Sequence, residues 1–180
     1  MIEIAVIVAV ANAPSQLSTR VLNALVWKAH PVEAASQINM SLSFLVGCLL
    51  AVAGGIIRLA CYRELGTLFT FELSIRKDHK LITSGPYAYV RHPSYAGLIF
   101  LYSGWCLCHL SPGSWLRECS GLPLHGNMSY ALVTICFMSH VWLIVVRTQK
   151  EDEMLRKEFR DWDDWAKRVP YCLIPYIFDL

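Results

Sequence analysis

The sequence predicts an all-α integral membrane protein, a helical bundle of about four spans that forms a single domain over residues 1–180. Hydrophobic residues make up 55% of the chain and charged residues only 17%, and the mean hydropathy is +0.41. Soluble domains carry about 25% charged residues, so this composition is too apolar for one of them. The apolar residues also gather in runs that approach the ~17–25 residues of a membrane helix.

Three of these runs are long enough, or nearly so, to cross a bilayer. They cover residues 41–60, 94–110 and 128–146. The first run carries Gly47, Ala51 and Gly55 at intervals of four, which is either a small-residue face for close helix packing or a chance arrangement. Within residues 1–40, a shorter apolar segment from Ile2 to Ala13 is expected to form a short or tilted first span.

Lys and Arg gather on two segments beside the spans, residues 61–93 and residues 147–180. By the positive-inside rule, both segments should face the cytosol. The connection between the last two spans contains Arg117 as its one basic residue, together with turn-forming Pro and Gly residues, so we expect it on the opposite side. The two basic segments can therefore form one cytosolic pocket built from helices and loops.

Several classes of function are disfavoured by the composition and spacing. The net charge is only +2 and basic residues alternate with acidic ones, so there is no basic stripe of the kind that binds nucleic acid. The seven cysteines are odd in number and show neither Cys-x-x-Cys nor His-Glu-x-x-His spacing, so we expect no disulfide framework and no metal site. A Gly-x-Gly-x-x-Gly turn is also missing, which argues against a Rossmann sheet.

The segment from Leu81 to Gly97 packs Arg91, His92 and three tyrosines against the start of an apolar run. Charged side chains would be costly deeper in the hydrocarbon, but Gly85-Pro86 and Pro93 break the chain just before the span begins. Polar chemistry held at a membrane boundary usually marks a functional site. The sequence therefore predicts that this segment covers a cavity.

Arg147 and Glu151 lie four residues apart where the last span ends, so on a continuous helix both side chains point to the same side. One interpretation is an exposed ion pair that stabilises the helix by only about 0.3–0.5 kcal/mol. The other is a cation and an anion that face a cavity and bind different parts of a ligand. Spacing alone leaves both open.

The C-terminal tail repeats apolar residues at helical spacing, which predicts an amphipathic helix at the membrane interface. These residues are Leu155, Phe159, Trp162, Ala166 and Val169. We also interpret the tail aromatics as interface anchors rather than binding residues. They are Trp162, Trp165, Tyr171, Tyr176 and Phe178.

Taken together, these motifs resemble the isoprenylcysteine carboxyl methyltransferases over about two thirds of the chain. The matching elements are Gly85-Pro86-Tyr87, the run Arg91-His92-Pro93-Ser94-Tyr95-Ala96-Gly97, then Arg147, Glu151-Asp152, Leu155, Phe159, Arg168-Val169-Pro170 and Ile174-Pro175. The resemblance implies transfer of a methyl group from S-adenosylmethionine to the C-terminal carboxylate of a prenylated cysteine. It further implies a multi-pass protein of the endoplasmic reticulum membrane that processes CaaX-type proteins, with the active site facing the cytosol.

The chemistry of such a reaction suits these residue types. A carboxylate is ionised at neutral pH and can attack a sulfonium methyl directly, so neither a nucleophilic side chain nor a strong base is required. Arg147 is expected to hold the carboxylate, because a guanidinium forms two parallel hydrogen bonds with it. The resemblance places Glu151 on the positively charged cofactor. It also places His79, Lys80, Leu81, Ile82, Tyr87, His92, Pro93, Ser94 and Tyr95 around S-adenosylmethionine.

Two alternatives remain at this point. A relative with the same cofactor half could methylate another membrane lipid, such as a phospholipid amine, in which case Arg147 has no obvious partner. A sterol-reductase-like or non-enzymatic membrane protein could keep a similar Arg-His-Pro-x-Tyr element for another ligand. Binding of S-adenosylmethionine separates the second alternative from the first.

Overall fold

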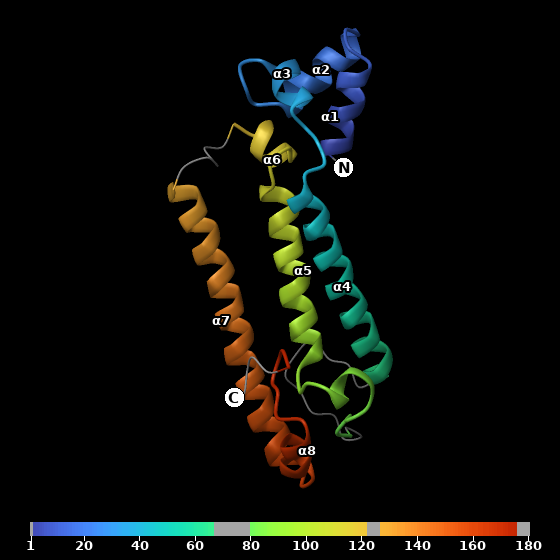
Figure 1. The fold of residues 1–180 in the computed structure, drawn as a ribbon, viewed down its shortest axis with the longest axis vertical. Helices are drawn as coiled ribbons and strands as arrows, with labels where there is room; N and C mark the ends of the chain where they lie inside the picture. Colours follow the sequence, from blue (N-terminus) through green and yellow to red (C-terminus); the bar gives the residue numbers. More distant parts are fainter. Residues whose placement is uncertain (1, 67–79, 122–126, 176–180) are drawn as a thin grey trace. The chain divides into compact units, whose positions relative to one another are not determined.

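A computed structural model describes residues 2–66, 80–121 and 127–175, and within these ranges the regular elements are all helices (Figure 1). The elements are α1 (Ile2–Ala11), α2 (Gln16–Leu25), α3 (Pro31–Ser36), α4 (Leu42–Leu65), η2 (Gly85–Ala88), α5 (Pro93–Leu110), α6 (Trp115–Glu118), α7 (Asn127–Glu158) and α8 (Trp162–Arg168). The helical class expected from the sequence is confirmed for the described residues.

Among the residues that the structure describes, two helices are long and apolar enough to cross a membrane, α4 and the part of α7 from Ala131 to Glu158. Only 17% and 6% of their most apolar windows are buried, so these are not the core helices of a soluble protein. α5, with 18 residues, coincides with the expected run 94–110 but is not one of these two helices, and α1 has only 10 residues. The membrane character is therefore confirmed, whereas the number of about four spans stays a prediction.

The chain divides into two compact units. The first, residues 1–50 and 103–134, packs α1, α2 and α3 around Val6 and Leu22, which are 0% and 2% exposed. Trp115 joins this core, because its indole Nε1 donates a hydrogen bond to the Leu25 carbonyl at 3.0 Å. The Ser15 hydroxyl caps α2 by accepting a hydrogen bond from the amide of Ser18. One face of the apolar helix α1 is thus covered by protein.

The second unit, residues 51–102 and 135–180, contains a very close approach of α4 to α5. A Cβ atom at Gly54 would lie 2.4 Å from the Gly97 carbonyl oxygen and 2.6 Å from the Leu101 amide nitrogen. A Cβ at Gly55, in contrast, would meet nothing within 4 Å. Of the two interpretations of Gly47, Ala51 and Gly55, the small-residue face therefore does not hold at Gly55, because the helix turns Gly54 toward its neighbour instead.

The tail differs from the expected interface helix. α7 continues past residue 146 to Glu158, the chain then turns, and α8 begins at Trp162. Trp162 and Trp165 are 8% and 3% exposed and form a buried cluster with Val169. Their assignment as interface anchors was wrong, because the turn folds the apolar face of α8 against protein rather than lipid. Tyr171 is half-buried, and the other two expected anchors, Tyr176 and Phe178, lie outside the described residues.

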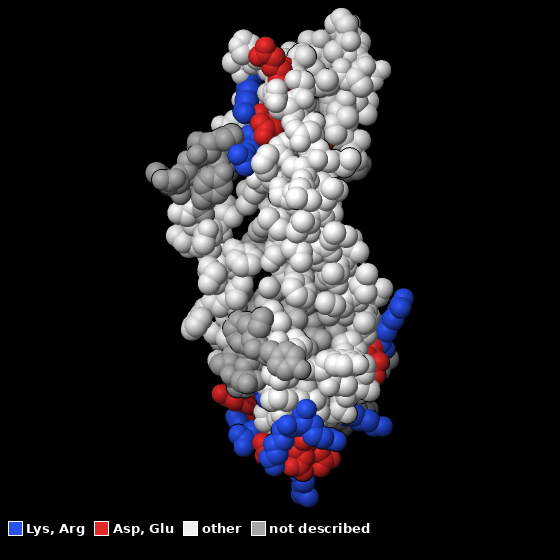
Figure 2. All heavy atoms as spheres, viewed as in Figure 1, with Lys and Arg blue, Asp and Glu red and all other residues white. Residues whose placement is uncertain are grey.

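Figure 2 shows charges of the second unit around α8 and the end of α7, and others at the end of α4, whereas the visible surface over the preceding turns of α7 is uncharged. Four large apolar side chains are exposed along that uncharged stretch. They are Ile135, Met138, Trp142 and Leu143. An apolar surface that ends at a charged one fits a helix that leaves the membrane near Arg147.

Candidate active site

The Arg-His-Pro segment is held between a tight turn and the tail of the chain. Gly85 starts the turn with a positive φ of 58°, and a Cβ there would lie 2.9 Å from a carboxylate oxygen of Glu64. Further on, the amide of Arg91 donates to the carbonyl of Tyr171, and the amide of His92 donates to the carbonyl of Cys172, both at 2.9 Å. The backbone of residues 91–92 is thus fixed before α5 begins.

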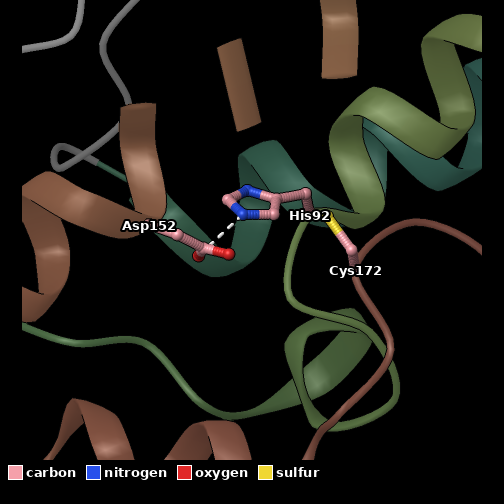
Figure 3. A group of neighbouring side chains, drawn as sticks. All are labelled: His92, Asp152 and Cys172. Carbon is pink, nitrogen blue, oxygen red and sulfur yellow. Dashed lines mark hydrogen bonds and ion pairs between the residues drawn. The ribbon is translucent and has the colours of Figure 1, made fainter. Parts of the chain in front are cut away.

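The side chains of this segment meet the end of α7 at Asp152 (Figure 3). The ring Nε2 of His92 lies 2.9 Å from Oδ1 of Asp152, and Nε of Arg91 lies 3.4 Å from Oδ2 of the same carboxylate. The side chains of His92 and Arg91 are only 3% and 6% exposed, and that of Asp152 is 16% exposed. A half-buried carboxylate therefore links the motif to α7 through two different partners.

His92, Asp152 and Cys172 form one group whose potential metal ligand atoms lie within 4.8 Å of one another. Such residue types bind zinc when the thiol is deprotonated and the carboxylate is available. Here Asp152 is already paired with Arg91, whose positive charge opposes a cation at the same place. Burial also raises the pKa of the Cys172 thiol and so favours its protonated form. The geometry favours an ionic network over a metal centre.

Tyr95 connects Arg147 with Glu151. Its hydroxyl donates a hydrogen bond to Oε2 of Glu151 at 2.9 Å, while the guanidinium of Arg147 lies 5.8 Å from the centre of its ring. Arg147 and Glu151 are both half-buried. Of the two interpretations that spacing left open, this arrangement favours a cation and an anion beside a cavity.

That cavity is an apolar groove of about 240 Å³ between α5 and α7, entirely within the second unit. Its walls are Tyr95, Leu98, Ile99 and Tyr102 from α5, and Phe137, His140, Val141, Leu143, Ile144 and Arg147 from α7. The Tyr102 ring stacks on Phe137 and on His140, with ring centres 5.8 and 4.7 Å apart. Arg147 lies two helical turns, about 10 Å, beyond His140 on the same helix.

The remaining residues expected around a cofactor are less closely grouped. Leu81 and Tyr87 pack against the buried tail cluster, and burial raises the pKa of the Tyr87 hydroxyl, which therefore stays neutral. Three others are described only by their positions: Pro93 begins α5, Ile82 is half-buried and Lys80 is exposed. His79 lies outside the described residues.

The structure adds three residues that sequence reasoning did not assign to the site. Asp152 and Cys172 meet the motif as described above. Arg58 extends from the apolar helix α4, and its Nη1 donates to the carbonyl oxygen of Ser94 at 3.1 Å. A charged residue inside an apolar run was a usable signal for Arg58, and the second acid beside Glu151 was one for Asp152. No sequence signal pointed to Cys172.

A model of the isoprenylcysteine carboxyl methyltransferase (ICMT) family matches residues 45–111. Protein-S-isoprenylcysteine O-methyltransferase of Homo sapiens is 33% identical over 134 residues, which are 73% of this chain and 40% of that protein. Protein-S-isoprenylcysteine O-methyltransferase B of Arabidopsis thaliana is 29% identical over 128 residues, 69% of this chain and 55% of that protein.

The chain is also similar to an enzyme of another class. Delta(14)-sterol reductase TM7SF2 of Mus musculus is 29% identical over 103 residues, 55% of this chain but only 20% of that protein. The chain thus spans about half the length, or less, of these three curated relatives. The resemblance inferred from the motifs is confirmed, and the chain is a relative of the isoprenylcysteine carboxyl methyltransferase family.

Proposed function

We propose that this chain transfers a methyl group from S-adenosylmethionine to the C-terminal carboxylate of a prenylated cysteine and so forms a methyl ester. One observation carries the proposal: Arg147 lies at the polar end of an apolar groove, beside the pair of Tyr95 and Glu151. A cation, an anion and an apolar surface are thereby brought together. A prenylcysteine and a sulfonium cofactor need these three features.

On the acceptor side, Arg147 would hold the carboxylate through its planar guanidinium and fix the attacking oxygen. Its ring partner, Tyr95, limits the orientations that the guanidinium can take. The groove walls, mostly aliphatic and aromatic, would cover the isoprenoid chain and remove it from lipid and water. The names of the human and Arabidopsis relatives specify the same acceptor for those proteins.

On the cofactor side, the donor set fits a positively charged ligand. Glu151 is a half-buried carboxylate whose position is fixed by the Tyr95 hydroxyl, and an anion there can pair with an ammonium or sulfonium charge. S-adenosylmethionine, when bound, supplies an activated methyl group. The task of the protein is then to align the two reactants and exclude water, because the acceptor is already ionised. His92, Tyr87 and the expected residues of the segment 79–95 complete the proposed cofactor side.

The proposed setting is the endoplasmic reticulum membrane, with the site facing the cytosol and CaaX-type proteins as substrates. The basic residues of segments 61–93 and 147–180 support this orientation. The charged end of the second unit, where α8 lies, supports a membrane boundary close to the site. A soluble protein carrying a prenyl anchor could then present its C terminus at that boundary.

The test is methyl transfer by the purified protein in lipid nanodiscs, with labelled S-adenosylmethionine and N-acetyl-farnesylcysteine as acceptor. A geranylgeranyl analogue and a phospholipid amine serve as parallel acceptors. Base-labile label on a prenylcysteine supports the proposal. Label only on the phospholipid overturns the acceptor, and absence of S-adenosylmethionine binding overturns the methyltransferase itself. For substitutions of the acidic residues of the site, Glu153→Gln is a matched control, because Glu153 is an exposed acid that follows Asp152 directly.

A further inference from the structure

We propose that Asp152 is a positioning residue that locks the His92 imidazole in one tautomer, with the proton on Nε2 and the lone pair exposed on Nδ1. The carboxylate oxygen Oδ1 lies 2.9 Å from Nε2. An ionised carboxylate accepts hydrogen bonds and cannot donate them, so Nε2 must carry the proton. Nδ1, on the opposite edge of the ring from Asp152 (Figure 3), is then an acceptor.

Arg91 explains why the carboxylate is ionised and why the ring needs no charge of its own. Its Nε lies 3.4 Å from the second oxygen, Oδ2, and both residues are largely buried. Guanidinium is permanently charged, so it balances the single negative charge of Asp152. A second positive charge, on the His92 ring that is only 3% exposed, would give the group of Arg91, His92 and Asp152 a net positive charge in a buried place. The network therefore favours a neutral imidazole.

Backbone contacts also fix the position of the segment that carries Arg91 and His92. The amides of residues 91 and 92 donate to the tail carbonyls of residues 171 and 172, and Pro93 immediately begins α5. The ring is thus anchored on its backbone side and at Nε2, and only Nδ1 remains for a ligand. In terms of the proposed function, on which this step rests, Nδ1 would accept a hydrogen bond from an N–H or O–H group of the cofactor.

An isosteric substitution of Asp152 is expected to reverse the tautomer of His92. In Asp152→Asn, the donor Arg91 requires the amide oxygen, which turns the amide NH₂ toward His92. Nε2 must then accept a hydrogen bond, and the proton moves to Nδ1. The side-chain shape is unchanged, so a change in cofactor affinity reports the reversed tautomer together with the loss of one negative charge, and not lost packing.

The experiment is ¹⁵N NMR of histidine-labelled protein in nanodiscs, without cofactor. His92→Gln identifies the His92 signals, since its amide can still donate to Asp152. The expected result is a protonated Nε2 and an unprotonated Nδ1 in the wild type, and the reverse in Asp152→Asn. Two protonated nitrogens in the wild type, or protonation at Nδ1 alone, would overturn the proposal.

Binding of S-adenosylmethionine provides the second readout. Both Asp152→Asn and His92→Gln are expected to lose at least about fivefold in affinity, the effect of about one hydrogen bond, while Glu153→Gln keeps wild-type affinity. Unchanged affinity in a folded Asp152→Asn protein with the reversed tautomer would overturn the assigned role of Nδ1. If Asp152→Asn does not fold, the wild-type spectrum still decides the tautomer. The NMR spectrum is recorded without cofactor, so it tests whether Asp152 fixes the His92 tautomer independently of the proposed function.

Discussion

Replacement of Gly54 by Ala should destabilise the protein, although it adds only one methyl group to a helix. The new Cβ would lie 2.4 Å from a backbone oxygen of Gly97, where ordinary contact begins at 3.4 Å, so α4 and α5 must separate by about 1 Å. The carbonyl oxygen of Gly97 and the amide nitrogen of Leu101 cannot rotate away from the new Cβ, because both belong to the backbone of α5. Overpacking of this kind costs about 1–3 kcal/mol. The shift would also move Tyr95 at the start of α5, and methyl transfer should fall with stability.

The neighbouring Gly55 is the matched control. A Cβ there meets nothing within 4 Å, so Gly55→Ala should be neutral or stabilise the helix by about 0.5–1 kcal/mol. Unfolding free energies of both variants can be measured in mixed micelles with increasing SDS. Equal stability of the two variants would refute the close approach of α4 and α5 and the energetic reasoning drawn from it.

Three further outcomes are expected. Arg147→Ala should lower kcat/KM by about 10- to 100-fold or more, because a charged hydrogen-bond donor is lost, and should spare S-adenosylmethionine binding. The kcat/KM of Arg147→Lys should lie between those of the wild type and Arg147→Ala. A parallel loss of S-adenosylmethionine binding would contradict the assigned role. Trp165→Ala should lower the free energy of unfolding by about 3–5 kcal/mol, because the side chain is buried. Trp142 is 67% exposed, so Trp142→Ala should lower it far less when both variants are compared by thermal unfolding. Burial raises the pKa of Cys172 above its ordinary value of 9.0, so its contribution to stability is complete below that value and is lost as the pH rises past it. Cys172→Ala should flatten the decline in unfolding midpoint above pH 9.0, and an unchanged slope would exclude the thiol as its source.

The sequence predicted the parts of the molecule whose signals are local. Apolar runs predicted α4, α5 and α7, and the Arg-His-Pro motif predicted a polar cluster before α5, where Arg91 and His92 meet Asp152. The spacing of Arg147 and Glu151 predicted that both side chains point to the same side of one helix, and in the structure both lie beside Tyr95. These features depend on the periodicity of one helix or on a short motif, and both can be read without knowing the neighbours.

The parts that depend on a partner were missed or misplaced. An amphipathic pattern indicates that Trp162 and Trp165 have an apolar side, but it does not say whether lipid or protein covers that side. Likewise, only the partner α5 decides that Gly54 rather than Gly55 is enclosed. Asp152 gained its role through His92, which is 60 residues away in the chain.

The two hydrogen bonds from residues 91–92 to the carbonyls of Tyr171 and Cys172 have a consequence for how inherited variants of this gene should be read. A premature stop codon just before Tyr171 would leave the whole Arg-His-Pro motif and residues 45–111, which the family model matches, intact. The encoded protein would nevertheless lose the two carbonyls that anchor the motif, together with the Cys172 thiol beside it. The final stretch of the message is therefore as necessary to the site as the motif itself.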